Sequence, residues 1–181
     1  MEKLDVDLFL WLNSFHNSFF DGVMLLVSNK KTWIPLYAAM LIWLFFKENN
    51  KIIAKLSLIF LSILLTDQTC SGILKPLLHR LRPCYNEKIS QIIHQVGDCG
   101  GQFGFASSHA GNSFALAMAW HLLFLQNSKW KSIPFIWAFV VAYSRIYLGV
   151  HYPADILVGG LIGIFYSSIL YYIFQKFSLN N

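Results

Sequence analysis

Charged residues are scarce in this chain of 181 residues. Asp, Glu, Lys and Arg together make up 13% of it, against roughly 25% in soluble domains. The apolar share is 56%, and aromatic residues alone contribute 17%. A soluble protein of this size cannot bury so much apolar surface. The composition therefore excludes an ordinary soluble domain and predicts a protein embedded in the lipid bilayer.

Several familiar sequence signals are also missing. The first residues, MEKLDVD, lack the charged-then-apolar-then-small pattern of a cleaved signal peptide, and no lipidation motif or low-complexity tract occurs. The formal net charge is +5, yet there is no basic stripe or basic helix, so nucleic acid is not an expected partner. The basic residues fall at the ends of apolar runs, as membrane-surface anchors and topology signals do.

Long apolar runs are what the chain has instead. Four or five are long enough to cross a bilayer as helices, and we place them at about 33–46, 52–74, 110–126, 132–149 and 156–175. Segment 8–28 is ambiguous: it is either an interfacial helix followed by a short or re-entrant one, or a sixth span. Backbone groups in lipid must be satisfied internally, and the alternation of a barrel strand is absent. We therefore predict an all-α integral membrane helical bundle of five to six transmembrane helices, in one domain covering residues 1–181.

The lysines of the short loops predict the orientation of this bundle. With five spans alternating from Trp33 onward, one side receives Lys47, Lys51, Lys55, Lys129, Lys131 and Lys176. The positive-inside rule makes that side cytoplasmic, and only Lys30 and Lys31 oppose it. We expect a multi-pass protein of the inner (plasma) membrane, whose other side faces the periplasm or the exterior.

Three polar islands interrupt the apolar background, all on the predicted outer side. They are residues 75–83 (KPLLHRLRP), 106–109 (ASSH) and 144–155 (SRIYLGVHYPAD). Charge inside or beside a membrane span is costly and usually functional. Together the islands hold lysine, arginine, histidine, paired serines and an aspartate, which are the groups needed to grip a phosphate and attack it.

The first island ends a span. Lys75 and Arg82 are seven positions apart, or two helical turns, so both can point the same way if the helix persists, and Pro83 should stop the helix. Lysine supplies a point charge and arginine a bidentate fork for phosphate oxygens. Ordinary headgroup anchoring is the alternative. For His79 and Arg80, contact with a second phosphate or headgroup and anchoring at the surface both remain open.

The second island begins a span. Ser107, Ser108 and His109 precede the helical run 110–125, so their hydroxyls and N–H groups lie where the helix dipole favours an anion. The alternative is a serine N-cap beside an uninvolved histidine.

The third island carries the strongest pattern. Arg145 ends one span, His151 follows six residues later, and Asp155 lies four residues further, in the first turn of the last helix. An aspartate one turn from a histidine can accept its Nδ1–H and leave Nε2 free as a nucleophile.

The order K-x6-R-P, S-x-H, S-R-x5-H-x3-D is similar to the three-part signature of the type-2 phosphatidate phosphatase superfamily, over about residues 50–175. That superfamily includes membrane lipid phosphatases, bacterial acid phosphatases and vanadium haloperoxidases. The resemblance implies that His151 attacks phosphorus and becomes a phosphohistidine, that Asp155 orients it, and that His109 protonates the leaving oxygen. It also implies no metal or other cofactor, and a phosphate-binding set of Lys75, Arg82, Ser107, Ser108 and Arg145.

Two positions depart from the family pattern. The second motif usually reads Pro-Ser-Gly-His, and here Ala106 replaces the proline while Ser108 replaces the glycine. Serine would be strained at Ser108 if that position needs a positive φ.

The leading functional hypothesis is an integral membrane lipid phosphatase, with a membrane lipid phosphate as its partner and an unassigned oligomeric state. Undecaprenyl diphosphate is the first choice of substrate, and phosphatidate, phosphatidylglycerophosphate and lipid A phosphate are alternatives. A vanadate-dependent oxidase and a non-catalytic lipid-phosphate binding or transport protein are hypotheses of other classes. The intact set of His151, Asp155 and His109 argues against a non-catalytic protein.

Three further features carry structural expectations. Cys84 and Cys99 bracket the long outer loop and are either a disulfide, which would add roughly 3 kcal/mol by loop closure, or two unrelated thiols. Asp67 lies in mid-span and is expected to be a buried interhelical hydrogen-bond partner. Gly159 and Gly163 form a GxxxG face that predicts close helix packing.

Overall fold

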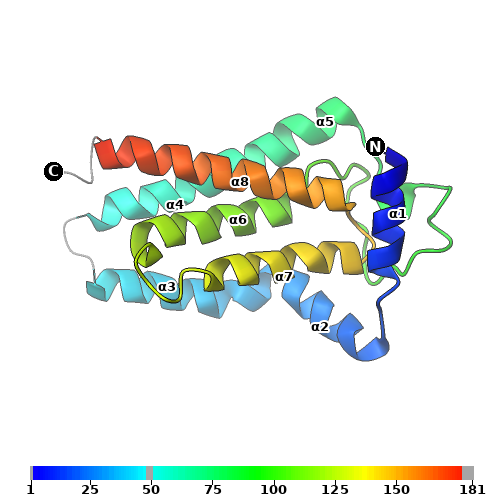
Figure 1. Ribbon diagram of the computed structural model, residues 1–181, viewed down its shortest axis with the longest axis horizontal. Coiled ribbons are helices and arrows are strands. Elements are labelled where there is room, and N and C mark those ends of the chain that lie inside the picture. The colour runs from blue at the N-terminus through cyan, green and yellow to red at the C-terminus, as the bar shows by residue number, and fades with distance from the viewer. Residues whose placement is uncertain (1, 48–50, 177–181) are drawn as a thin grey trace.

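The regular elements are helices throughout the described part of the chain, so the all-α prediction is confirmed. The computed structural model describes residues 2–47 and 51–176. Five helical segments lie side by side as a bundle (Figure 1): α3 (Ile34–Lys47), α4 (Ile52–Asp67), α6 (Ser108–Trp120), α7 (Ile133–Tyr147) and α8 (Pro153–Phe174). Two of them continue beyond these bounds. A π-helical turn, Gln68–Leu74, joins α4 to α5 (Lys75–Leu78), and another, His121–Leu125, extends α6.

Two helices are long and apolar enough to cross a membrane, judged by length and composition over the described residues. They are Ile52–Leu78, with 27 residues, and Pro153–Phe174, with 22. The count of five to six transmembrane helices remains a prediction.

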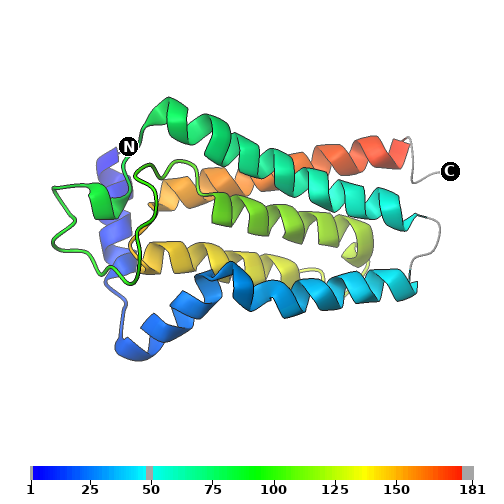
Figure 2. The same ribbon diagram turned by 180° about the vertical axis from the view of Figure 1, so that it is seen from behind.

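The ambiguous N-terminal segment forms two helices rather than one span. α1 (Glu2–Asn13) lies across one end of the bundle, and α2 (Ser18–Ser28) runs obliquely from it to the short 3-10 turn that precedes α3 (Figures 1 and 2). The outward face of α1 leaves Leu4, Leu8 and Trp11 exposed, while Phe9 is fully buried. Exposed apolar residues at this spacing are typical of a helix lying in the membrane interface.

α6 is the central helix, and it packs on α8, α7 and α4. Its buried face consists mainly of alanine, glycine and serine, the small residues that let helices approach closely in lipid. A Cβ atom at Gly163 would lie 2.2 Å from the carbonyl oxygen of Gly111, and one at Gly159 would lie 2.4 Å from that of Ser107. The close packing expected from the GxxxG spacing is therefore present, between α8 and α6.

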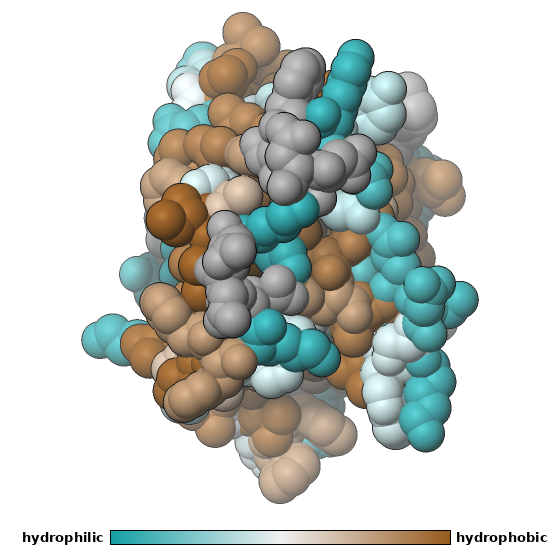
Figure 3. Space-filling model, turned by 90° about the vertical axis from the view of Figure 1, so that its left-hand side faces the viewer, coloured by the Kyte–Doolittle hydropathy of each residue, from teal (hydrophilic) through white to brown (hydrophobic). Residues whose placement is uncertain are grey.

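The two ends of the bundle hold different segments. One end holds the end of α3, the start of α4, the connection between α6 and α7 and the last turn of α8 (Figure 1), and hydrophilic and apolar residues are mixed on its surface (Figure 3). The lysines used to predict the cytoplasmic side lie in or next to these segments. The other end holds α1, α5 and the long connection 79–107 (Figure 2). All three polar islands meet at this second end.

Candidate active site

A backbone hydrogen bond joins the second island to the third, and another lies within the third. The N–H of Ser107 donates to the carbonyl of Asp155 at 2.9 Å, and the N–H of His151 donates to the carbonyl of Arg145 at 3.2 Å. Ser107 is also the N-cap of α6, since its hydroxyl accepts from the N–H of Ala110. The N-terminus of α6 is therefore fixed against the connection between α7 and α8.

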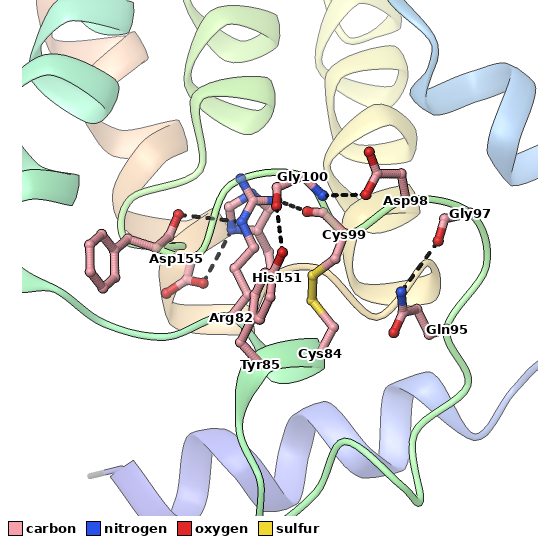
Figure 4. The surroundings of a disulfide bond; sticks show 11 residues. Arg82, Cys84, Tyr85, Gln95, Gly97, Asp98, Cys99, Gly100, His151 and Asp155 are labelled. Atoms are coloured by element: carbon pink, nitrogen blue, oxygen red, sulfur yellow. Dashed lines mark hydrogen bonds and ion pairs between the residues drawn. A yellow bond between two sulfur atoms is a disulfide. The ribbon is translucent and has the colours of Figure 1, made fainter.

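His151 and Asp155 form the buried pair that the third island predicts. The Nδ1 atom of His151 lies 3.3 Å from Oδ2 of Asp155, and the two side chains are 2% and 0% exposed. The same Oδ2 accepts the N–H of Tyr152 at 3.0 Å. This contact occupies Nδ1 and leaves Nε2 of the imidazole for chemistry (Figure 4).

The electrostatic surroundings keep His151 neutral. Burial lowers its pKa well below the ordinary value for histidine, and the positive charges of Arg82, Arg145 and Lys75 lower this pKa further. A neutral imidazole has the lone pair that a nucleophile requires. The three cations predicted to bind phosphate thus converge on this histidine.

Lys75 is held by two hydroxyls. Its ammonium donates to Oγ of Ser108 at 3.2 Å and to Oγ of Ser71 at 3.5 Å, and these two oxygens lie 2.5 Å apart. Ser108 begins α6, and among the described non-glycine residues only His79 has a positive φ. The serine that replaces the family's glycine is therefore accommodated without a left-handed backbone.

The two arginines predicted to bind phosphate, Arg82 and Arg145, are held in place by hydrogen bonds. Nε of Arg82 donates to the carbonyl of Phe103 at 3.3 Å, and Nη1 donates to that of Cys99 at 2.9 Å (Figure 4). Arg145 donates to the hydroxyl of Ser28 through Nη1, while its buried Nε finds no partner in the described part of the chain. A buried guanidinium N–H without an acceptor is a favourable place for an anionic oxygen.

A disulfide closes the loop that begins two residues after Arg82. The structure joins Cys84 to Cys99 with a Cα–Cα distance of 6.4 Å, within the range of protein disulfides. Because Cys99 also supplies the carbonyl that receives Arg82, the bridge fixes this arginine from two points of the chain.

His109 links the polar cluster to an apolar cavity. It stands in the first turn of α6, close to the positive charges of Arg145 and Lys30. Together with Ser28 and Lys30 it lines a cavity of about 410 Å³, whose remaining walls from α3, α4, α6 and α7 are mostly apolar and include Tyr37, Leu44, Ile59, Leu116, Trp120 and Val141. Polar groups that could grip a headgroup therefore open onto a space suited to a hydrocarbon chain.

The sequence patterns did not predict two residues of the site, Arg80 and Asp5. Arg80, for which headgroup contact and surface anchoring were both open, instead forms an ion pair with Asp155 at 2.7 Å and one with Asp5 of α1 at 2.5 Å. These partners lie 75 residues away in the chain, so no local motif connects them. By contrast, the interhelical hydrogen bond expected of Asp67 is confirmed, because Nδ2 of Asn112 on α6 donates to Oδ1 of Asp67 at 2.9 Å, although Asp67 is half-buried rather than buried.

Comparisons with known proteins identify the family to which the sequence is related. The sequence profile of the PAP2 superfamily matches residues 55–179. The lipid A 4'-phosphatase of Bacteroides thetaiotaomicron is 39% identical over 180 residues, which cover 97% of this chain and 79% of that protein. The lipid A 4'-phosphatase of Porphyromonas gingivalis is 33% identical, with 95% and 73% covered. The undecaprenyl-diphosphatase of Sulfolobus acidocaldarius is 28% identical, with 88% and 73% covered.

A solved structure supports the same placement. The crystal structure of Aquifex aeolicus LpxE superimposes with a TM-score of 0.73 at 26% identity, and the match covers 92% of this chain and 94% of that one. The family profile spans well over half of the chain and includes all three polar islands. This chain belongs to the PAP2 superfamily.

Proposed function

We propose that this PAP2 lipid phosphatase acts on lipid A, from which it removes a phosphate group. The observation that carries this choice is the 39% identity to a lipid A 4'-phosphatase across 97% of the chain. Undecaprenyl diphosphate, the first choice from sequence, has a more distant relative at 28% and becomes the second candidate. Phosphatidate and phosphatidylglycerophosphate follow as further alternatives.

The cavity beside His109 supports a lipid substrate. Its few polar lining residues, Ser28, Lys30 and His109, and its mostly apolar walls match an amphipathic molecule, with a phosphate at the cation cluster and a hydrocarbon chain between α3, α4 and α6. A soluble phosphate ester would leave this apolar space unfilled.

The proposed reaction begins at His151. The lone pair on its Nε2 attacks phosphorus, the bond from phosphorus to the lipid oxygen breaks, and His109 donates a proton to that leaving oxygen. Lys75, Arg82 and Arg145 stabilise the negative charge on the phosphoryl oxygens in the transition state. The Nδ1 proton of His151 stays on the ring, where the carboxylate of Asp155 stabilises the positive charge that forms.

The second half of the reaction releases the phosphate. His109, now neutral, takes a proton from a water molecule, whose oxygen attacks the phosphohistidine. The phosphorus–nitrogen bond breaks, and its electron pair returns to Nε2 of His151. Inorganic phosphate leaves, and both histidines regain their starting protonation.

A phosphate-release panel on the purified protein tests the substrate. Lipid A, undecaprenyl diphosphate, phosphatidate and phosphatidylglycerophosphate should all be offered in the same mixed micelles, and lipid A should give the highest kcat/KM. EDTA should leave the rate unchanged, and vanadate should inhibit as a phosphate mimic. A higher kcat/KM on undecaprenyl diphosphate would reverse the order of the candidates. Strong inhibition by EDTA, reversed by Mg²⁺, would contradict the metal-free scheme.

We further propose a multi-pass arrangement in the inner membrane with the site facing the periplasm or exterior. The lysine-rich end of the bundle then faces the cytoplasm, and the disulfide loop lies in an oxidising compartment. An impermeant thiol reagent applied to spheroplasts should label Cys84 and Cys99 only after reduction. Labelling that requires the inner face to be opened would contradict this orientation and exclude an outer-leaflet substrate.

A further inference from the structure

A chain of ion pairs and hydrogen bonds runs from α1 to His151. Oδ2 of Asp155 contacts Nδ1 of His151, while its other oxygen, Oδ1, accepts from Nη1 of Arg80 at 2.7 Å. The second terminal nitrogen of Arg80, Nη2, donates to Oδ2 of Asp5 at 2.5 Å. Arg80 thus bridges two carboxylates, that of Asp5 in the N-terminal helix and that of Asp155 in the site.

The guanidinium of Arg80 is enclosed on its faces as well as at its ends. Its Cζ atom lies 4.3 Å from the ring centroid of Tyr152 and 6.0 Å from that of Phe105, which is the geometry of cation–π contacts. Its side chain is 22% exposed, while that of Asp155 is 0% exposed. A fully buried carboxylate without a cation is strongly unfavourable, and Arg80 is a cation in direct contact with Asp155.

Asp5 fixes this arginine to the helix that carries Asp155. While Oδ2 of Asp5 pairs with Arg80, its Oδ1 accepts the N–H of Ala154, in the first turn of α8, at 2.9 Å. One turn along α1, the ring of Phe9 packs edge-on against Tyr152 with centroids 5.4 Å apart. α1 is therefore held in register with the start of α8 by a charge, a hydrogen bond and a buried ring.

We propose that Arg80 and Asp5 are positioning residues, which hold Asp155 ionised with one oxygen aimed at Nδ1 of His151. This inference rests on the proposed phosphohistidine reaction, and it makes α1 a part of the catalytic apparatus. The competing role is a structural one, in which the two residues only attach α1 to the bundle.

Steady-state kinetics of three variants separate these roles. Arg80→Gln should lower kcat by about 10- to 100-fold, the range typical for loss of a partner that orients a functional side chain, with KM within about twofold of wild type. Arg80→Lys, which keeps the cation, should recover part of this loss. Asp5→Asn should give a smaller fall, because its amide oxygen can still accept from Ala154. Asp7→Asn, on an exposed carboxylate of the same helix, is the matched control and should equal wild type.

A purely structural role of Arg80 would leave the pH dependence of kcat unchanged, so this dependence separates the two roles. Asp155 lies close to the cations Arg80 and Arg82 and to the titratable side chains of His151 and Tyr152. Arg80 stands between it and the carboxylate of Asp5. Without the guanidinium of Arg80, this buried carboxylate takes up a proton more readily, so the acid limb of the profile should move to higher pH in Arg80→Gln. Arg80→Lys should leave the limb close to its wild-type position.

The possible outcomes are distinct. Equal kcat and equal pH profiles for Arg80→Gln and Asp7→Asn, in a wild type that releases phosphate, would overturn the positioning role alone. A fall in kcat that follows only the fraction of folded protein, with an unmoved acid limb, would also overturn it. If Arg80→Gln does not fold, Asp5→Asn provides the test, and wild-type values of kcat and pH limb would then count against the proposal. A wild type that releases no phosphate from any lipid of the panel would overturn the proposed function, and this inference with it.

Discussion

Replacing His151 with alanine should lower phosphate release by about four to six orders of magnitude, as removal of a catalytic nucleophile does. The residue is almost fully buried beside three cations, and no other histidine is paired with Asp155 in the described residues. The alanine variant should still bind the lipid, because Lys75, Arg82 and Arg145 remain. Turnover of lipid A by purified protein, together with binding of the radiolabelled lipid, measures both effects.

Two other histidines supply the controls for this prediction. His16 is exposed and stacks on His94 away from the site, so His16→Ala should keep normal turnover. His109→Ala should slow the hydrolysis of a lipid strongly but that of nitrophenyl phosphate less, because a good leaving group needs little protonation. Near-normal turnover by His151→Ala would refute the phosphohistidine mechanism.

The helices of the bundle could be predicted from sequence because hydropathy is local information. The five expected apolar runs fall within a few residues of α3, α4, α6, α7 and α8, when the π-helical continuations of α4 and α6 are included. The N-terminal segment could not be assigned in this way. Its first helix is held by contacts with distant residues. For example, the side-chain amide of Asn13 donates hydrogen bonds to the carbonyls of His94, Ile146 and Tyr147.

The same distinction applies to the candidate site. His151 and Asp155 lie one helical turn apart, so their spacing alone predicts the pair that the structure contains. Asp5 and Arg80 meet across 75 residues, and no sequence period encodes that meeting. The choice of lipid is also non-local, because the cavity beside His109 has walls from four helices. The islands could therefore predict a phosphoryl site, but not which lipid carries the phosphate.

The second large effect is expected at the contact between α6 and α8. Gly163→Ala should destabilise the fold by about 3 kcal/mol or more, the upper range for overpacking, because the new Cβ would lie 2.2 Å from the carbonyl oxygen of Gly111. A backbone carbonyl cannot rotate aside as a side chain can, so the two helices must separate. Thermal unfolding of the detergent-solubilised variant, followed by loss of helical circular dichroism, measures this effect.

The neighbouring glycine offers a matched control for that clash. A Cβ atom at Gly160 would meet only the ring of Phe114, at 3.1 Å, and a ring can shift, so Gly160→Ala should cost much less stability than Gly163→Ala. Separation of the helices should also reduce activity in the protein that stays folded, because α6 carries His109 and α8 carries Asp155. Equal stabilities for the two alanine variants would mean that α6 and α8 do not touch at Gly163, and the site could not then be assembled as the structure has it.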